Sequence, residues 1–191
     1  AYLRAGGLVT NQTGAMISGA ANGVLFNNAN ASTTPGTVDN AGTIAGGTAA
    51  VQFHAGLNNL LVERPGATIS GTVDGGPTIG AGAVSTLELA SGATAGTLSG
   101  LGAQFINFAQ VLVDAGATWS LAGSNSIAAG MGVTNNGTLI DAGSLTSAGS
   151  ITAGIQLAPG AVLDNSGAIG GGGVYGNTGG ASTVINSGSI N

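Results

Sequence analysis

The chain has 191 residues, of which 38 are glycine, and it carries no cysteine and a formal net charge of −5. Arg4 and Arg64 are its only cations, so it lacks the basic cluster that binding to nucleic acid or to anionic lipid requires, and without cysteine it cannot form a disulfide framework. Hydrophobic residues make up 43% of the chain and the mean hydropathy is +0.42, which predicts an ordered protein with a core of small aliphatic side chains.

The first part of the chain carries a motif of the form aliphatic-x-Asn-x-Gly-x-Ile/Leu. It appears as VDNAGTI at 38–44 and in a longer version as VTNQTGAMI at 9–17, and a sister Gly-Ala-Thr motif appears as RPGATISG at 64–71. The apolar segments between these Gly/Asn corners are too short for amphipathic helices or ordinary hairpins, and they predict short strands. Polar residues also interrupt every apolar run well before the roughly 18 residues that a membrane-spanning helix needs.

From residue 121 the chain repeats every six residues. Aliphatic side chains fill nine consecutive positions of this period, with Tyr175 at the tenth: Leu121, Ile127, Val133, Leu139, Leu145, Ile151, Leu157, Leu163 and Ile169. A helix repeats about every 3.6 residues and a strand every two, so this period belongs to neither alone. We predict that each six-residue unit is one side of a triangular coil, with its aliphatic side chain pointing inward and stacking on its counterpart one coil away.

These repeats predict an all-β chain folded as a parallel β-solenoid of about eight or nine coils that stack about 4.8 Å apart. Residues 1–191 form a single solenoid segment, with loops inserted between the coils of 1–120 and regular six-residue sides in 121–191. A right-handed solenoid is favoured because parallel crossovers are overwhelmingly right-handed, and a left-handed hexapeptide-type helix is the alternative. The corners are expected to need the positive φ that Gly and Asn tolerate. Both ends lie inside repeats, so we expect a segment of a longer chain.

Five asparagines occupy the same slot of the Asn-x-Gly motif: Asn11, Asn40, Asn135, Asn165 and Asn186. We predict corner residues whose amides satisfy turn backbone groups and stack into ladders, and a polar ligand-binding ladder is the alternative. For the aromatic residues Phe105, Phe108 and Trp119 a carbohydrate-stacking patch is the alternative. The apolar, strand-like sequence FINFAQVLV favours filling of the core instead.

The ionisable residues give no catalytic or metal-binding pattern. His54 is the only histidine and is expected to be exposed to solvent, since catalysis would need a nucleophile and an orienting carboxylate within reach. A glycosidase needs carboxylates about 5–10 Å apart, whereas here the acids are spread along the chain and are expected to be surface charges that prevent sheet association: Asp39, Glu63, Asp74, Glu88, Asp114, Asp141 and Asp164. The glycine runs at 71–76 and 167–176 lack the regularly repeated aspartates of calcium-binding β-rolls. We therefore predict no catalytic residue, metal or cofactor.

The stretches NNGTLIDAGSL, VDNAGTIAGG and DAGATWSLAGSNSIAAG resemble the passenger regions of bacterial autotransporters and related large secreted adhesins. The last stretch is similar to the passenger-associated repeat through Gly116, Trp119, Leu121, Gly123 and Asn125. The resemblance implies a β-helical stalk at the surface of a Gram-negative bacterium, anchored to the outer membrane or secreted.

The leading hypothesis for function is a non-enzymatic stalk or adhesin segment that mediates attachment or projects a binding tip. Its partner would be a host or neighbouring-cell surface or glycan, contacted in part through loops at 29–35 and 75–83, with no nucleic acid and no membrane insertion by this segment. The alternative is a subunit of an extracellular filament or surface layer that binds copies of itself. A polysaccharide-degrading β-helix enzyme is the third hypothesis.

Overall fold

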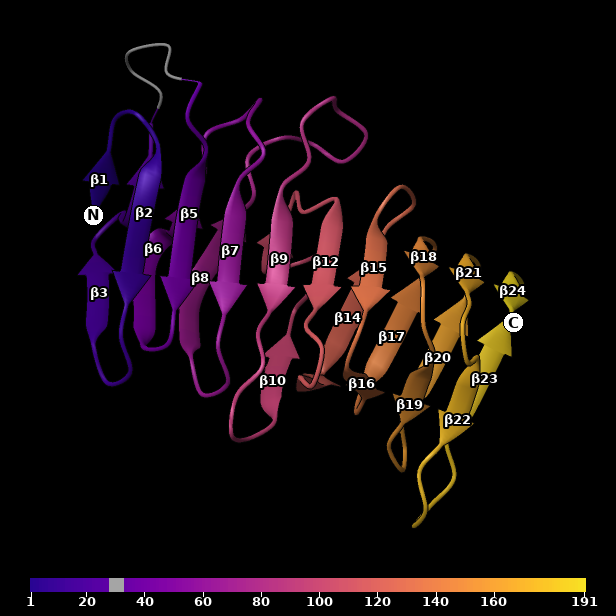
Figure 1. Cartoon of the computed structure of the whole chain (residues 1–191). Helices are drawn as coiled ribbons and strands as arrows, with labels where there is room; N and C mark the ends of the chain where they lie inside the picture. The colour runs from indigo at the N-terminus through magenta and orange to yellow at the C-terminus, as the bar shows by residue number, and fades with distance from the viewer. Residues whose placement is uncertain (28–32) are drawn as a thin grey trace. The chain divides into compact units, whose positions relative to one another are not determined.

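The computed structural model describes residues 1–27 and 33–191, and the regular secondary structure of these residues is entirely β-strand (Figure 1). The strands pair in parallel and the chain makes about eight turns of a β-solenoid, which confirms the predicted fold class. The hand of the solenoid stays a prediction. The contacts divide the chain into two compact units: unit 1 comprises residues 1–88 and 104–109, and unit 2 comprises residues 89–103 and 110–191.

Unit 1 contains strands of two sheets. The first has the order β1 (Tyr2–Leu3), β4 (Asn22–Phe26), β6 (Thr43–Gln52), β8 (Thr68–Asp74) and β11 (Phe105–Ile106), and β3 (Met16–Gly19) also pairs with β6. The second has the order β2 (Gly7–Asn11), β5 (Gly36–Asn40), β7 (Leu60–Glu63) and β9 (Thr86–Leu89). The ten-residue strand β6 pairs with β3 along its first part and with β4 along its second. One strand therefore forms the part of its coil that two separate strands form in the preceding coil.

The core of unit 1 is formed by alternate residues of these strands. Val38, Ile44, Leu61 and Val73 are completely buried. The rings of Phe26 and Phe53 are buried and stack with their centroids 5.1 Å apart. Side chains between the buried ones face outward, as expected for strands with one face on the core.

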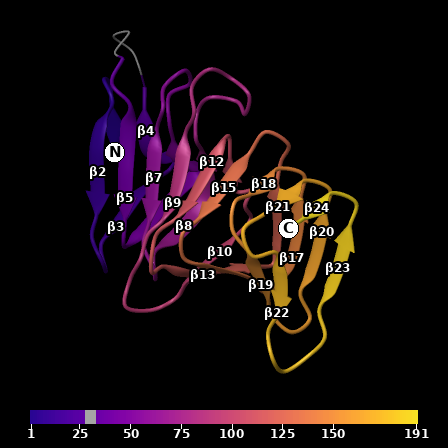
Figure 2. The same cartoon turned by 45° about the vertical axis from the view of Figure 1, so that its right-hand side comes forward.

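Unit 2 contains three sheets, one for each side of a triangle (Figure 2). The first has the order β12 (Gln110–Val113), β15 (Gly132–Asn135), β18 (Ser150–Ile151), β21 (Ala168–Ile169) and β24 (Ser189–Ile190). The second has the order β10 (Gly96–Ser99), β13 (Thr118–Ala122), β16 (Thr138–Asp141), β19 (Ile155–Leu157) and β22 (Val174–Gly176). The third has the order β14 (Ser124–Ile127), β17 (Ser144–Ser147), β20 (Val162–Asn165) and β23 (Thr183–Asn186).

All nine aliphatic residues of the six-residue period are buried, but they do not all stack on one another. Val133 pairs with Ile151 and Ile151 with Ile169, as a coil of 18 residues requires. Leu121, however, pairs with Asp141, and Ile127 pairs with Ser147, because the preceding coil is two residues longer. Leu157 also pairs with Asp141 rather than with Leu139, so the predicted stacking of every member on its counterpart is wrong at three positions.

The tenth member of the series also departs from the pattern. Tyr175 pairs with the outward-facing Gln156 and is 49% exposed, whereas its neighbour Val174 pairs with the buried Ile155. The coil between β19 and β22 is 19 residues long, one more than the six-residue period requires, so Val174 rather than Tyr175 takes the inward position.

Gly14, in the longer version of the Asn-x-Gly motif, has the predicted positive φ, but the other motif glycines are needed for a different reason. Gly42 and Gly167 do not have positive φ, and among the described residues Asn107 is the one non-glycine residue that does. A Cβ atom at Gly42 would overlap the carbonyl oxygen of Ala15, and one at Gly167 would overlap that of Gly149. Positive φ occurs instead at glycines of the sister motif, such as Gly66 and Gly116. The motif glycine thus lets the backbones of successive coils approach closely.

Candidate functional site

The five motif asparagines lie at two different corners of the fold. Asn11, Asn40 and Asn135 each end a strand of the β2–β5–β7 or β12–β15–β18 series, and Asn165 and Asn186 end strands of the β14–β17–β20–β23 sheet. In unit 1 Asn11 pairs with Asn40, and in unit 2 Asn165 pairs with Asn186. One sequence motif therefore builds two kinds of corner.

The corner of unit 1 is a continuous polar ladder of three side chains. Asn11 donates from Nδ2 to Oδ1 of Asn40 at 2.9 Å, and Asn40 donates from its own Nδ2 to both carboxyl oxygens of Glu63 at 3.3 Å. The Asn40 Oδ1 atom also accepts the backbone N–H of Gly42, which fixes the turn. Asn11, Asn40 and Glu63 are 2%, 0% and 3% exposed, so the ladder is an interior feature.

Glu63 was expected to be a surface charge, and this prediction is wrong. The register places it directly after Asn40 in the ladder, where burial raises the pKa of its carboxyl to about 8. The hydrogen bond from Asn40 lowers the pKa and the neighbouring Asp39 carboxylate raises it, and both effects are smaller than that of burial. At neutral pH the Glu63 carboxyl is therefore mainly protonated. Val-Glu-Arg at 62–64 has no Asn-x-Gly signature, so no sequence pattern pointed to this role.

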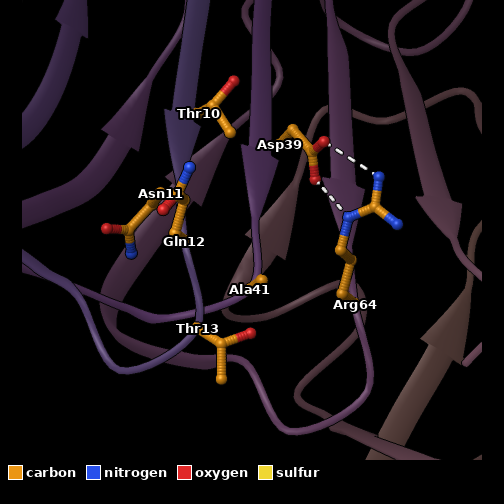
Figure 3. Close-up of a pocket in the computed structure, with 7 residues that line it drawn as sticks. All are labelled: Thr10, Asn11, Gln12, Thr13, Asp39, Ala41 and Arg64. Carbon is orange, nitrogen blue, oxygen red and sulfur yellow. Dashed lines mark hydrogen bonds and ion pairs between the residues drawn. The ribbon is translucent and has the colours of Figure 1, made fainter. Parts of the chain in front are cut away.

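A shallow open hollow of about 370 Å³ lies on the solvent side of this corner. Its lining residues are Thr10, Asn11, Gln12, Thr13, Asp39, Ala41 and Arg64 (Figure 3). The Arg64 guanidinium donates from Nε and Nη2 to the two oxygens of Asp39 at 2.7 and 2.9 Å. The hollow thus offers hydroxyl, amide and ion-paired groups. Glu63 is buried beneath the surface, so Asp39 and Glu63 do not form a solvent-accessible pair of catalytic carboxylates.

The corners of unit 2 use the same turn with different neighbours. Asn135 accepts the N–H of Gly137 and donates to the carbonyl of Gly154 at 3.0 Å. Asn165 donates to Oδ1 of Asn186 at 2.8 Å, but its own buried Oδ1 has no hydrogen-bond partner. Asn186 is exposed. These asparagines hold turns and neighbouring coils together.

Asp141 is a second acid that the structure buries, against expectation. Its Oδ1 accepts the N–H of Gly143 at 3.0 Å, as at an Asn corner, whereas its Oδ2 is buried without a partner. The register places it between Leu121 and Leu157. Burial raises the pKa of its carboxyl, and the hydrogen bond from Gly143 partly opposes the rise.

The remaining acids are closer to the surface, as predicted. Asp164 is exposed and four others are half-buried: Asp39, Asp74, Glu88 and Asp114. Asp74 accepts the backbone N–H of Gly76 at 2.9 Å and the side-chain amide of Asn107 at 2.8 Å, so it stabilises a loop.

His54 is half-buried rather than exposed, and its buried Nδ1 has no hydrogen-bond partner. The nearby Ser85 is completely buried, and its hydroxyl donates to the Gly75 carbonyl at 2.7 Å and accepts the N–H of Asn59. Asn59, which the sequence did not single out, donates to the carbonyls of His54 and Gly75 and accepts the N–H of Gly36. Ser85 and Asn59 therefore anchor the loop that follows β8 rather than activate a nucleophile.

The aromatic side chains fill the core, as predicted. Phe105 and Phe108 are 4% and 0% exposed in unit 1, and Trp119 is 2% exposed in unit 2. The indole of Trp119 lies over Gly96 and donates to the Ala90 carbonyl at 2.9 Å. None of the three presents a stacking surface to a sugar.

The two loops suggested as contact sites differ in what the structure describes. Residues 29–32 of the 29–35 loop lie outside the described residues. In the 75–83 loop, Thr78, Gly80, Ala81 and Gly82 are exposed, whereas Gly75 and Pro77 at its base are buried.

Within residues 1–27 and 33–191 no group of three or more His, Asp or Glu side chains is placed to hold a metal ion. Nor do these residues include a helix with the length and hydrophobicity to cross a bilayer. Comparisons with protein-family profiles, with curated proteins and with solved structures give no match to the chain.

Proposed function

We propose that the chain is a non-enzymatic stalk segment of an extracellular, autotransporter-type surface protein, in which stacked coils hold a binding tip away from the cell. The observation that carries the proposal is that the residues of the repeated pattern build the stack of coils. In unit 2 each side of a coil pairs in parallel with the same side of the next coil, through β15 and β18, β16 and β19, and β17 and β20. The residues that make the repeat recognisable are the ones that build this stack.

The polar groups of the interior support the same function. The Asn11–Asn40–Glu63 ladder, Asn59 and Ser85 bond to neighbouring coils or to their own turns. Such bonds hold coils together rather than orient a substrate. A rod built in this way lengthens by about 4.8 Å for each added coil, so its length can be set by coil number. The cell-surface location rests on the resemblance of the sequence motifs to autotransporter passengers.

The experiment is a coil deletion in the full-length protein in its producing bacterium. Ser150 pairs with Ala168, so removal of residues 150–167 takes out one complete coil and returns Ala168 to the position of Ser150. We expect this variant to reach the cell surface and to support attachment of cells as the native protein does. Removal of residues 150–158 is the matched control, because half a coil disrupts the register in all three sheets and should abolish both.

Surface exposure is measured by antibody labelling of intact cells through a peptide tag inserted after Gly80, an exposed position in the loop between β8 and β9. Loss of attachment after the one-coil deletion, with normal surface labelling, would contradict a spacer role and place binding within this segment. Release of reducing sugar ends from a glycan panel would instead establish an enzyme. Regular filaments in negative-stain images would establish an assembly subunit.

A further inference from the structure

The Asn11–Asn40–Glu63 ladder joins the ends of three strands through side chains and backbone together. Asn11 ends β2, Asn40 ends β5 and Glu63 ends β7. Beside the side-chain bonds, the N–H of Ala41 donates to the carbonyl of Asn11 at 2.8 Å, and the N–H of Arg64 donates to that of Asn40 at 2.9 Å. The ladder is thus the point at which three successive coils of unit 1 are held at one corner.

The last member of the ladder is the only one that can change its charge. Both oxygens of Glu63 share one amide group, that of Asn40, and the carboxyl is 3% exposed. A protonated carboxyl is neutral and tolerates this setting, whereas a carboxylate would be a buried charge held by a single neutral donor.

The charged groups around Glu63 do not favour its ionisation. On β5 the neighbouring group is the Asp39 carboxylate, which repels a second negative charge. Arg64 follows β7 and bonds to Asp39 through two hydrogen bonds, and β9 contributes another acid, Glu88. The strands β2, β3 and β6 carry no ionisable side chain, and the one on β8 is Asp74, which bonds to Gly76 and Asn107.

We propose that this ladder is a proton-operated lock on the corner of unit 1. With a proton on Glu63 the ladder holds the ends of β2, β5 and β7 together, and loss of the proton in alkaline solution releases them. The inference concerns unit 1 alone and does not rest on the proposed function.

The direction of the pH effect follows from the titration of Glu63. Its pKa in the folded chain, about 8, lies above the ordinary value of 4.5, so the folded state binds this proton more tightly than the unfolded state does. The stabilisation is complete below about pH 4.5, decreases as the pH rises and is lost above about pH 8. Between pH 7 and pH 9 the equilibrium against opening is expected to fall about tenfold.

The first test needs no variant. The chain has two glutamates, Glu63 and Glu88, so carbon-13 NMR of the glutamate carboxyl groups of the native protein resolves the titration directly. We expect one of the two resonances to titrate with a midpoint near pH 8. Titration of both resonances below pH 6 would overturn the proposal.

The second test asks whether that proton controls the corner. Hydrogen exchange at the Ala41 and Arg64 amides, corrected for the intrinsic exchange rate, should lose about tenfold protection between pH 7 and pH 9 in the native chain. The Glu63→Gln variant keeps a neutral side chain of the same shape and should show no such loss. Asp141→Asn in unit 2 is the matched control and should behave as the native chain does at these amides.

The outcomes separate cleanly. Equal loss of protection in the native chain and in Glu63→Gln, or no loss in the native chain, would overturn the lock. Loss of protection that disappears in Asp141→Asn would assign the response to the other buried acid and would also overturn it. If Glu63→Gln does not fold, the carboxyl titration of the native chain and the Asp141→Asn exchange data still decide the question.

Discussion

The sequences VDNAGTI at 38–44 and LDNSGAI at 163–169 are nearly the same, yet they build corners with different chemistry. In unit 1 the Oδ1 atom of Asn40 accepts hydrogen bonds from Asn11 and from Gly42, and its Nδ2 continues the ladder to Glu63. In unit 2 Asn165 stacks between Ser147 and the exposed Asn186, and its Oδ1 is buried without a partner. The motif determines the turn, whereas the residues one coil away determine how well the turn is satisfied.

The part that the two corners share is the close approach at the motif glycine, and breaking it should have the largest effect. Gly42→Ala and Gly167→Ala each place a Cβ against a backbone carbonyl of the preceding coil. This carbonyl cannot move away without separating the two coils. We expect each to lower the free energy of unfolding by at least about 3 kcal/mol, measured by urea denaturation. Gly82→Ala is the control, because Gly82 is exposed with open space around it, and it should change stability by less than about 0.5 kcal/mol. Equal, small effects of all three would contradict the close-contact role.

The part that differs is the number of hydrogen bonds made by the asparagine. Asn40→Ala removes the partners of Asn11, Gly42 and Glu63 inside the corner, and we expect a loss of about 2–3 kcal/mol. Asn165→Ala removes one short bond to Asn186 at 2.8 Å and two long ones to the carbonyls of Gly167 and Ser189 at 3.4 and 3.3 Å. Because Oδ1 of Asn165 is already unsatisfied, a loss of about 1 kcal/mol is expected. Thermal and urea denaturation of the two variants side by side test the difference. A larger loss for Asn165→Ala would show that the ladder in unit 1 adds nothing to the turn itself.

The comparison also indicates how the corner of unit 2 can be improved. Ser147 occupies the position relative to Asn165 that Asn11 occupies relative to Asn40, and its buried hydroxyl has no partner. Ser147→Asn should donate to Oδ1 of Asn165 and extend the ladder by one member, raising the free energy of unfolding by about 1 kcal/mol. Thr146→Asn, at an exposed position beside Ser147, is the control and should change stability by less than about 0.5 kcal/mol. If Ser147→Asn is destabilising, the corner of unit 2 has less room for an asparagine side chain than the corner of unit 1, and the two corners differ in packing as well as in hydrogen bonding.

Much of the fold could be predicted from the sequence, because a solenoid repeats its pattern along the chain. The short strands, their parallel pairing and the inward position of the nine aliphatic residues all follow from spacing alone. The candidate site could be predicted only in part. The five asparagines are recognisable by their motif. Glu63, Asn59 and Ser85 belong to no repeated pattern and are buried by residues of the neighbouring coils.

The sequence by itself determined the kind of object: a stack of short-sided coils with corners marked by Asn and Gly. The tertiary structure decided the register between coils, which varies with the length of each coil. That register places Glu63 on Asn40 and Asp141 between two leucines, and so turns two acids expected at the surface into buried, protonatable groups. The physical reason is that the spacing along a strand shows which way a side chain points, but its burial and its pKa depend on neighbours that are about one coil away in sequence.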